Sequence, residues 1–229
     1  MTRAIFPSHD SRPTRTIEDY LMTMSVMERD QGEIVAARLA ERMGVAPPTV
    51  TMTLKRMERD GWITGTGRKA VRLTETGRAA AHSVIRRHML AEWLLVEMLK
   101  VPLEQVHEEA HGIEHAISPQ LEARLREALG DRQVCPHGNP FPGCESVVQA
   151  WTALTDLRAG EGGVLRRIHE FAEDDPQVIT FLYARGLTPG ASLRVQEVLP
   201  FNQTLTVEVQ ENALTLGFAV ARYLFVERT

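Results

Sequence analysis

The sequence predicts a mainly α-helical protein with a small β domain at its C-terminal end. Two observations predict this fold class. Apolar residues recur with helical spacing through most of residues 14–129, whereas the short apolar runs after Thr152 suit half-buried strands. A connector rich in proline and glycine, residues 135–143, separates the two patterns. We expect three domains, with boundaries at 1–80, 81–150 and 151–229.

The first domain contains a helix-turn-helix pattern. Helical spacing of apolar residues predicts a first helix that ends at the polar residues 30–33. A short helix over residues 34–43 follows, and Gly44 begins a tight turn. Pro47 and Pro48 then open another helix, because proline is tolerated in the first turn of a helix. Two helices joined by a short turn with glycine are typical of DNA-binding helix-turn-helix motifs.

A hairpin with a basic tip follows this motif. Residues 62–64 and 71–73 are the expected strands, and basic residues lie between them, as in a wing. The outward face of the preceding helix bears Thr, Lys and Arg and has no carboxylate before Glu58. An incidental pair of amphipathic helices is the alternative, but the basic face and hairpin together favour DNA binding. The predicted contacts to base edges and phosphates come from Pro48, Thr49, Thr51, Met52, Lys55, Arg56, Arg68 and Lys69.

The second domain is helical and carries a stripe of three histidines. A long helix breaks at a Val-Pro pair, and the next helix is expected over residues 103–115. His107, His111 and His115 are four residues apart, so they share one face of that helix, which Glu114 joins. Neutral imidazole and carboxylate oxygen are donors that divalent Mn, Fe and Zn prefer. The sequence therefore predicts a metal at this stripe.

The stripe is too long for a single ion. His107 and His115 are separated by roughly 12 Å along the helix axis at about 1.5 Å per residue, whereas ligand bonds are only about 2.0–2.2 Å long. Two sites are therefore expected, and antiparallel packing of the preceding helix would bring further ligands to His107. The predicted sets are His88, Glu92 and His107, and His111, Glu114 and His115, with Asp19 of the first helix as a candidate for the latter.

Residues 107–111 also match the H-E-x-x-H pattern of zinc proteases. In that pattern the glutamate, here Glu108, is the general base that activates a zinc-bound water. A match of three fixed positions arises often by chance. The third ligand normally comes from beyond a turn or from another helix, whereas His115 lies on the same expected helix. A zinc hydrolase is therefore the weaker alternative.

The remaining elements complete the fold class. Ser118 and Pro119 are typical of a helix start and predict a further helix. Beyond the connector, strands are expected over residues 164–168, 192–198, 205–209 and 219–226, with a helix over 176–185. This pattern suggests a small β-barrel.

Composition excludes some classes of protein. The sequence has no run of 18 apolar residues and no N-terminal apolar segment, so neither a membrane span nor a signal peptide is expected. Cys135 and Cys144 do not form a CxxC pair, which argues against a disulfide framework and for the cytoplasm. Cys135 and His137 could ligate a metal, but three prolines favour a stiff connector instead. The net charge of −4 argues weakly against nucleic acid, although residues 1–75 hold 12 Lys and Arg against 10 Asp and Glu.

Several segments together resemble one family, the diphtheria toxin repressor and manganese transport regulator family of metal-dependent transcriptional regulators. They are residues 18–21, 40–50, 56–61, 73–77, 88–92, 106–110, 114–115 and 136–140. The resemblance implies a winged helix-turn-helix, a helical dimerisation domain and an SH3-like (FeoA-like) β-barrel. It also implies a homodimeric repressor, not an enzyme, that binds operator DNA and controls metal homeostasis.

The resemblance also implies the metal ligands. The family's primary site would map onto Asp19, His111, Glu114 and His115, and its ancillary site onto His88, Glu92 and His107. Asp175 and Gln177 are the nearest matches for barrel residues that complete the ancillary site, and Glu173 and Asp174 compete with them.

The chain departs from the family pattern at three positions. His111 stands where iron-type members have Cys and manganese-type members have Glu, so it leaves the metal open. Asp19 stands where the iron type has Met and the manganese type has Asp, which favours manganese. Met22 replaces the Glu of two-metal manganese types and argues against that kind of cluster. We therefore expect Mn²⁺, with Fe²⁺ as the alternative.

Overall fold

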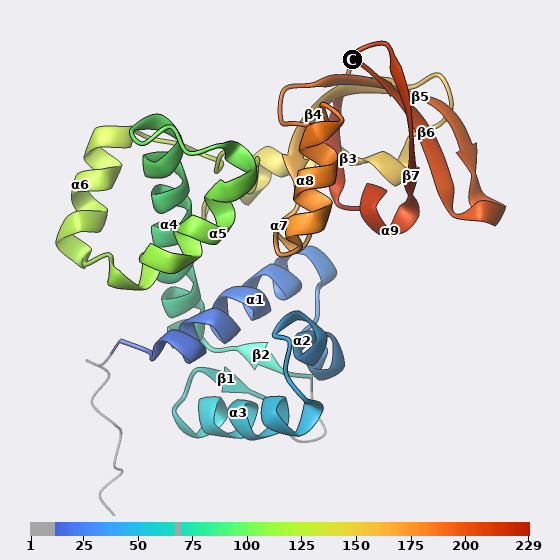
Figure 1. Cartoon of the computed structure of the whole chain (residues 1–229). Helices are drawn as coiled ribbons and strands as arrows, with labels where there is room; N and C mark the ends of the chain where they lie inside the picture. Colours follow the sequence, from blue (N-terminus) through green and yellow to red (C-terminus); the bar gives the residue numbers. More distant parts are fainter. Residues whose placement is uncertain (1–11, 67–69) are drawn as a thin grey trace, which may run out of the picture. The chain divides into compact units, whose positions relative to one another are not determined.

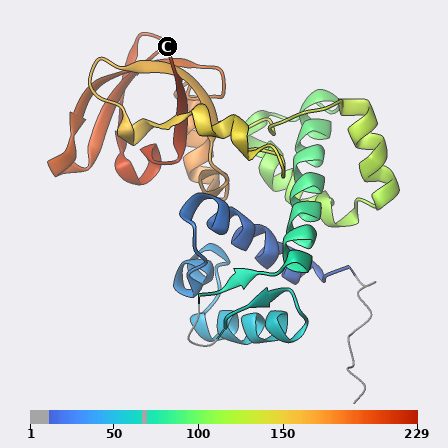
Figure 2. The ribbon, with the colours of Figure 1, turned by 180° about the vertical axis from the view of Figure 1, so that it is seen from behind.

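The computed structural model describes residues 12–66 and 70–229, which form two compact units. The first unit ends at Ile85 and the second begins at Arg86, so helix α4 (Glu75–Glu97) contributes residues to both (Figures 1 and 2). The second unit contains both the helices up to Leu129 and the C-terminal sheet. The division into three domains stays a prediction.

The first unit contains the predicted helix-turn-helix. Its elements are α1 (Arg15–Gln31), α2 (Ala36–Arg42), α3 (Pro47–Arg59), β1 (Ile63–Thr64), β2 (Arg72–Leu73) and the start of α4. Helix α1 ends at Gly32, whose φ of 73° is favourable only for glycine. Its core includes Leu21, Met24, Leu39, Val50 and Met57, each fully buried, which are the apolar positions with helical spacing.

The hairpin packs against the start of α4. Strands β1 and β2 are antiparallel, with Ile63 opposite Leu73. A Cβ atom at Gly77 would lie 1.9 Å from the carbonyl oxygen of Trp62, so only glycine lets α4 approach the hairpin this closely. Arg68 and Lys69, which the sequence predicts as phosphate contacts, lie outside the described residues.

The helical part of the second unit contains α5 (Leu103–Ile113) and α6 (Pro119–Leu129) beside the end of α4. The Ser118 hydroxyl caps α6 by accepting a hydrogen bond from the backbone N–H of Leu121. The expected helix over residues 103–115 is shorter than predicted, because the chain tightens into the 3-10 turn η1 (Glu114–Ala116). This change of pitch turns Glu114 into the core, where it is fully buried.

The connector is a folded loop fixed to the β domain. A Cβ atom at Gly138 would lie 1.9 Å from the carbonyl oxygen of Arg166. The Asn139 side chain donates to the Ile168 carbonyl at 2.8 Å and accepts from Arg167 at 2.6 Å. His137 is therefore buried rather than exposed on a linker.

The C-terminal part is an antiparallel sheet with the strand order β3-β8-β4-β5-β6-β7. The strands are β3 (Thr152–Ala153), β4 (Gly162–Ile168), β5 (Ser192–Leu199), β6 (Thr204–Val209), β7 (Asn212–Gly217) and β8 (Leu224–Arg228). Short 3-10 turns η2 (Glu145–Ala150), η3 (Leu154–Asp156) and η4 (Pro200–Asn202) and helices α7 (Glu170–Glu173), α8 (Pro176–Ala184) and α9 (Phe218–Ala221) complete it. In both ribbon views α8 lies beside the sheet, and its Ile179 and Leu182 join the apolar core (Figures 1 and 2).

Two expectations for this part are corrected. The strand expected over residues 219–226 is the helix α9 followed by β8, and β7 was not predicted. Among the described strands, β3 and β7 each pair on one side only, so the sheet is open rather than a closed barrel. Among the described residues, no helix is long and apolar enough to cross a membrane.

Candidate metal centre and nucleic-acid interface

A cluster of side chains that could bind a metal ion, most of them buried, lies in the second unit. It draws residues from α4, α5, η1, the connector and α7. Its members are His88, Glu92, His107, His111, Glu114, His115, Cys135, His137 and Glu173. Helices α4 and α5 bring together residues 19 positions apart in the sequence, since the rings of His88 and His107 are in contact.

The first group in this cluster consists of His88, Glu92 and His107. The Nε2 atom of His88 lies 3.1 Å from Nδ1 of His107 and 3.4 Å from Oε1 of Glu92. Nδ1 of His107 lies 3.6 Å from the same carboxylate oxygen. Within the described residues neither oxygen of the buried Glu92 carboxylate has a hydrogen bond of good geometry. A buried carboxylate without such bonds, facing imidazole nitrogens, is a donor set that fits a divalent cation.

Helix α7 and the residue that follows it add acidic side chains to this group. Oε2 of Glu173 lies 2.9 Å from Nδ1 of His107, and Oδ1 of Asp174 lies 3.4 Å from Nε2 of the same ring. The carboxylate of Asp175 instead caps α8, accepting from the backbone N–H groups of Gln177 at 3.0 Å and of Val178 at 3.4 Å. Gln177 is exposed. The geometry therefore favours Glu173 and Asp174 over Asp175 and Gln177.

The connector contributes two donors that sequence reasoning assigned to a spacer. Nδ1 of His137 lies 3.3 Å from Oε1 of Glu92 and 3.4 Å from Oε2 of Glu173. Cys135, also buried, has its sulfur within 4.8 Å of donor atoms of Glu92 and His137. The available signal was the Cys-x-His spacing, but nothing in the sequence shows that the loop folds back toward α4.

The second group is organised around Glu114. Its Oε1 atom lies 3.0 Å from Nδ1 of His111 and 3.1 Å from Nε2 of His115. Its Oε2 atom lies 2.5 Å from Nδ1 of His88, so His88 faces both groups with one nitrogen each. The Arg87 side chain donates to the carbonyl oxygen of Glu114 at 3.1 Å, which fixes η1 to α4.

Without a cation, several ionisable groups of this cluster shift one another's pKa values. Burial lowers the pKa of His88, but the Glu92 charge and the Glu114 hydrogen bond outweigh it and raise that pKa to about 9. Burial raises the pKa of Glu114, but hydrogen bonds from His111 and His88 lower it to about 2. Burial likewise opposes ionisation of Glu92, yet the charge of His88 and the nearby imidazoles hold its pKa well below the usual range. A bound cation would displace protons from these imidazoles.

Asp19 lies on α1 in the first unit and is half-buried. The other predicted ligands of its site, His111, Glu114 and His115, belong to the second unit, where they lie together. Participation of Asp19 stays a prediction.

The predicted DNA-contacting residues of α3 lie on its solvent-facing side. Those within the described residues are all exposed: Pro48, Thr49, Thr51, Met52, Lys55 and Arg56. Met52 is 74% exposed, which is unusual for methionine and is typical of a surface that a partner covers. The Thr51 hydroxyl donates to the carbonyl oxygen of Pro47 at 3.0 Å.

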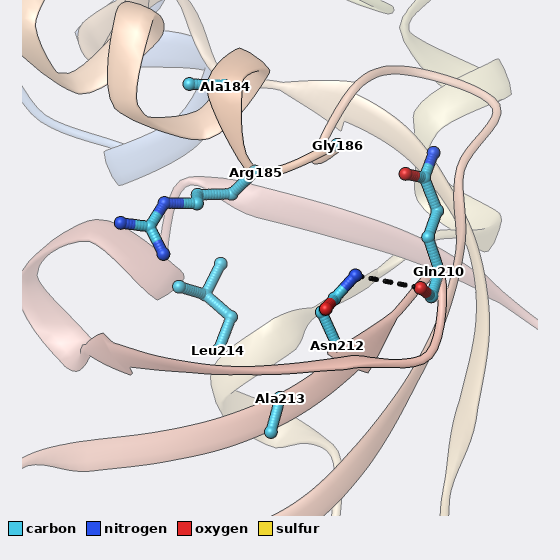
Figure 3. A pocket seen from close by; sticks show the side chains of 7 residues that line it. All are labelled: Ala184, Arg185, Gly186, Gln210, Asn212, Ala213 and Leu214. Atoms are coloured by element: carbon cyan, nitrogen blue, oxygen red, sulfur yellow. Dashed lines mark hydrogen bonds between the residues drawn. The ribbon is translucent and has the colours of Figure 1, made fainter.

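Neither of two other candidate sites has a suitable donor set. His107 and His111, the two histidines of the H-E-x-x-H match, belong to different groups of the cluster, one with Glu92 and the other with Glu114. Glu108 is exposed. A pocket between the end of α8 and the β6–β7 turn presents Arg185, Gln210 and Asn212 (Figure 3), and no His, Cys, Asp or Glu lines it.

Three protein families match consecutive parts of the chain. The family described as iron dependent repressor, N-terminal DNA binding domain, matches residues 13–71. The family described as iron dependent repressor, metal binding and dimerisation domain, matches residues 74–143, and the FeoA domain matches residues 152–228.

Relatives match the chain over nearly its whole length. The iron-dependent repressor IdeR of Mycobacterium tuberculosis (strain ATCC 25618 / H37Rv) is 36% identical over 224 residues, which cover 93% of this chain and 97% of that protein. A solved structure of a manganese-dependent transcriptional repressor in complex with manganese is 30% identical, with a TM-score of 0.80 and coverage of 93% of this chain and 100% of the other. The structure of T. acidophilum IdeR is 27% identical, with a TM-score of 0.73 and coverage of 93% and 97%. This chain therefore belongs to the iron-dependent repressor family of metal-dependent DNA-binding transcriptional regulators, which are not enzymes.

Proposed function

We propose that this protein is a homodimeric repressor in the cytoplasm that binds operator DNA when Mn²⁺ is available, with Fe²⁺ as the alternative metal, and so controls metal homeostasis. The observation that carries the proposal is the Glu92 carboxylate, which is buried among three imidazoles without a well-formed hydrogen bond. A cation supplies the positive charge that such a site lacks when its imidazoles are neutral.

The donors support manganese or iron. Carboxylate oxygens and imidazole nitrogens suit Mn²⁺, and Asp19 adds an oxygen where iron-type members of the family have a thioether. The buried Cys135 adds a softer sulfur donor, which keeps Fe²⁺ as the alternative. The relatives are consistent with either metal, since one is named an iron-dependent repressor and another is a structure with manganese.

Two sets of residues would hold the metal. Asp19, His111, Glu114 and His115 would form the primary site, and His88, Glu92, His107 and Glu173 the ancillary site. In this proposal, bound metal would link Asp19 to the other ligands of the primary site. Asp19 lies at the start of α1, which precedes the helix-turn-helix in the chain, so its ligation would restrict the motions of the DNA-binding unit.

The helical part of the second unit exposes apolar side chains that a second copy of the chain would cover. Met98 and Leu99, directly after α4, are 69% and 63% exposed, and Leu121 of α6 is exposed as well. Exposed apolar side chains of this size are typical of a protein interface. A two-fold dimer would place two α3 helices about one turn of DNA apart, roughly 34 Å.

A gel-shift titration of operator DNA tests the proposal. We expect chelator to weaken DNA binding by about 5- to 150-fold relative to Mn²⁺. The Asp19→Ala variant should bind DNA weakly in both conditions yet remain a folded dimer. Glu33→Ala removes an exposed carboxylate of the same unit and should respond to Mn²⁺ as the wild type does. Equal affinity of the wild type with and without metal would refute the proposal.

A further inference from the structure

Helix α3 carries one acidic residue, Glu58, in its last turn beside basic side chains such as Lys55 and Arg59. A carboxylate on a face that meets DNA repels phosphate groups and weakens binding. Glu58 is exposed, so a role in the core does not explain why a carboxylate is present here. The hydrogen bonds that Glu58 makes within the first unit explain it.

Glu58 binds the hairpin where the chain leaves β1. Its Oε1 atom accepts hydrogen bonds from the backbone N–H groups of Gly65 at 2.9 Å and of Thr66 at 3.1 Å. Its Oε2 atom accepts from the Thr66 hydroxyl. These bonds lower the pKa of Glu58, the Thr66 hydroxyl having the largest effect.

The backbone at Gly65 explains why one oxygen reaches two amides. Gly65 has a φ of 90°, in the region that only glycine adopts readily. Consecutive N–H groups in such a turn point to the same side of the chain and form an anion-binding concavity. The carboxylate of Glu58 occupies that concavity from a helix eight residues back in the sequence.

We propose that Glu58 is a positioning residue that fastens the wing hairpin to the recognition helix α3. Each hydrogen bond joins α3 to residues directly after β1, so the hairpin keeps one orientation relative to the helix that enters the DNA groove. The inference rests on the proposed DNA binding. Its consequence is that the favourable effect of an ordered hairpin exceeds the repulsion between Glu58 and phosphate.

Two substitutions separate these opposing effects. Glu58→Ala removes both the charge and the hydrogen bonds. Glu58→Gln removes the charge but can keep the contacts, because its amide oxygen accepts from Gly65 and Thr66 while its NH₂ group donates to the Thr66 hydroxyl. Simple charge repulsion predicts that both variants bind DNA more tightly. The positioning role predicts that Glu58→Gln binds DNA at least as tightly as the wild type, whereas Glu58→Ala binds DNA more weakly.

Operator binding by the Mn²⁺-loaded wild type and variants is measured by fluorescence anisotropy over a range of salt concentrations. We expect Glu58→Ala to bind about three- to tenfold more weakly and to lose about one to two units of salt slope, as for lost phosphate contacts. Asp60→Asn removes a neighbouring carboxylate that pairs with Arg59 rather than with the hairpin, and should not weaken binding.

A second measurement does not involve DNA. Amide hydrogen exchange at Gly65 and Thr66 should be slow in the wild type and in Glu58→Gln and fast in Glu58→Ala. Unchanged exchange together with tighter DNA binding by Glu58→Ala would overturn the inference. Failure of the wild type itself to bind DNA with Mn²⁺ would overturn the proposed function instead.

Discussion

The exposed face of α3 and the side-chain cluster of the second unit are both built from polar side chains, but only the cluster contains fully buried ones. Lys55 and Arg56 are exposed, so solvent screens their charges and each can be replaced with little effect on folding. His88 and Glu92 are buried, and their charges are balanced by one another, by neighbouring side chains such as Glu114 and His107, or by a cation. The comparison teaches that buried polar side chains couple ligand binding to the stability of the fold. Exposed polar side chains instead affect only the binding of a partner.

The largest effect is expected at Glu92. In the metal-free protein, Glu92→Ala leaves the imidazoles of His88, His107 and His137 without their shared counter-charge. We expect a loss of about 3 kcal/mol in the free energy of unfolding, measured by urea denaturation in chelator. Mn²⁺ at about 100 times the wild-type Kd should stabilise the wild type by about 2.7 kcal/mol and the variant much less. The matched exposed control is Glu109→Ala on α5, with an expected change within about 0.5 kcal/mol.

A smaller effect distinguishes Glu173 from Asp175. Glu173 is buried beside His107, so Glu173→Ala should weaken Mn²⁺ binding at the ancillary site by about 10- to 100-fold in isothermal titration calorimetry. Asp175→Ala removes the cap of α8 and should lower stability by about 1 kcal/mol while leaving Mn²⁺ affinity unchanged. If Asp175→Ala weakened Mn²⁺ binding and Glu173→Ala did not, Asp175 rather than Glu173 would be the ligand.

The smallest effect is expected on the exposed face. Lys55→Ala should leave unfolding and Mn²⁺ binding unchanged, because the side chain is exposed. It should weaken binding to operator and to unrelated DNA equally and lower the salt slope by about one unit. A preferential loss for operator DNA, seen in competition gel shifts, would mean that Lys55 contacts a base edge rather than a phosphate.

Local signals in the sequence were sufficient for the helix-turn-helix. The buried row of α3 follows from its 3.6-residue spacing, and Pro47 at its start and Gly44 in the turn mark the boundaries. The C-terminal part was harder, because the apolar residues 219–226 suit a strand as well as a short helix followed by a strand. Strand β7 carries alternating Leu214 and Leu216, a signal that was present and overlooked.

The proximity of the candidate ligands was predicted where it depends on helical spacing. His88 and Glu92 follow from an i, i+4 pair on α4, and His107 from the expected packing of the next helix against α4. Asp175 stays a predicted ligand, but Asp before Pro at a helix start is also typical of an N-cap, which is the contact that its carboxylate makes in the structure. The position of His137 near Glu92 could not be predicted from local sequence patterns, because it depends on a loop that packs on a strand about thirty residues later.

The attachment of Gly138 and Asn139 to β4 has a consequence for how the candidate metal ligands come together. The sheet holds the loop that carries His137, and helix α7, which follows β4, places Glu173 beside His107. A truncated chain that stopped before residue 145 would lose Glu173 and the anchor of that loop at once, and its imidazoles would be hydrated. Full occupancy of this site by metal therefore requires that the last third of the chain has folded against the helices.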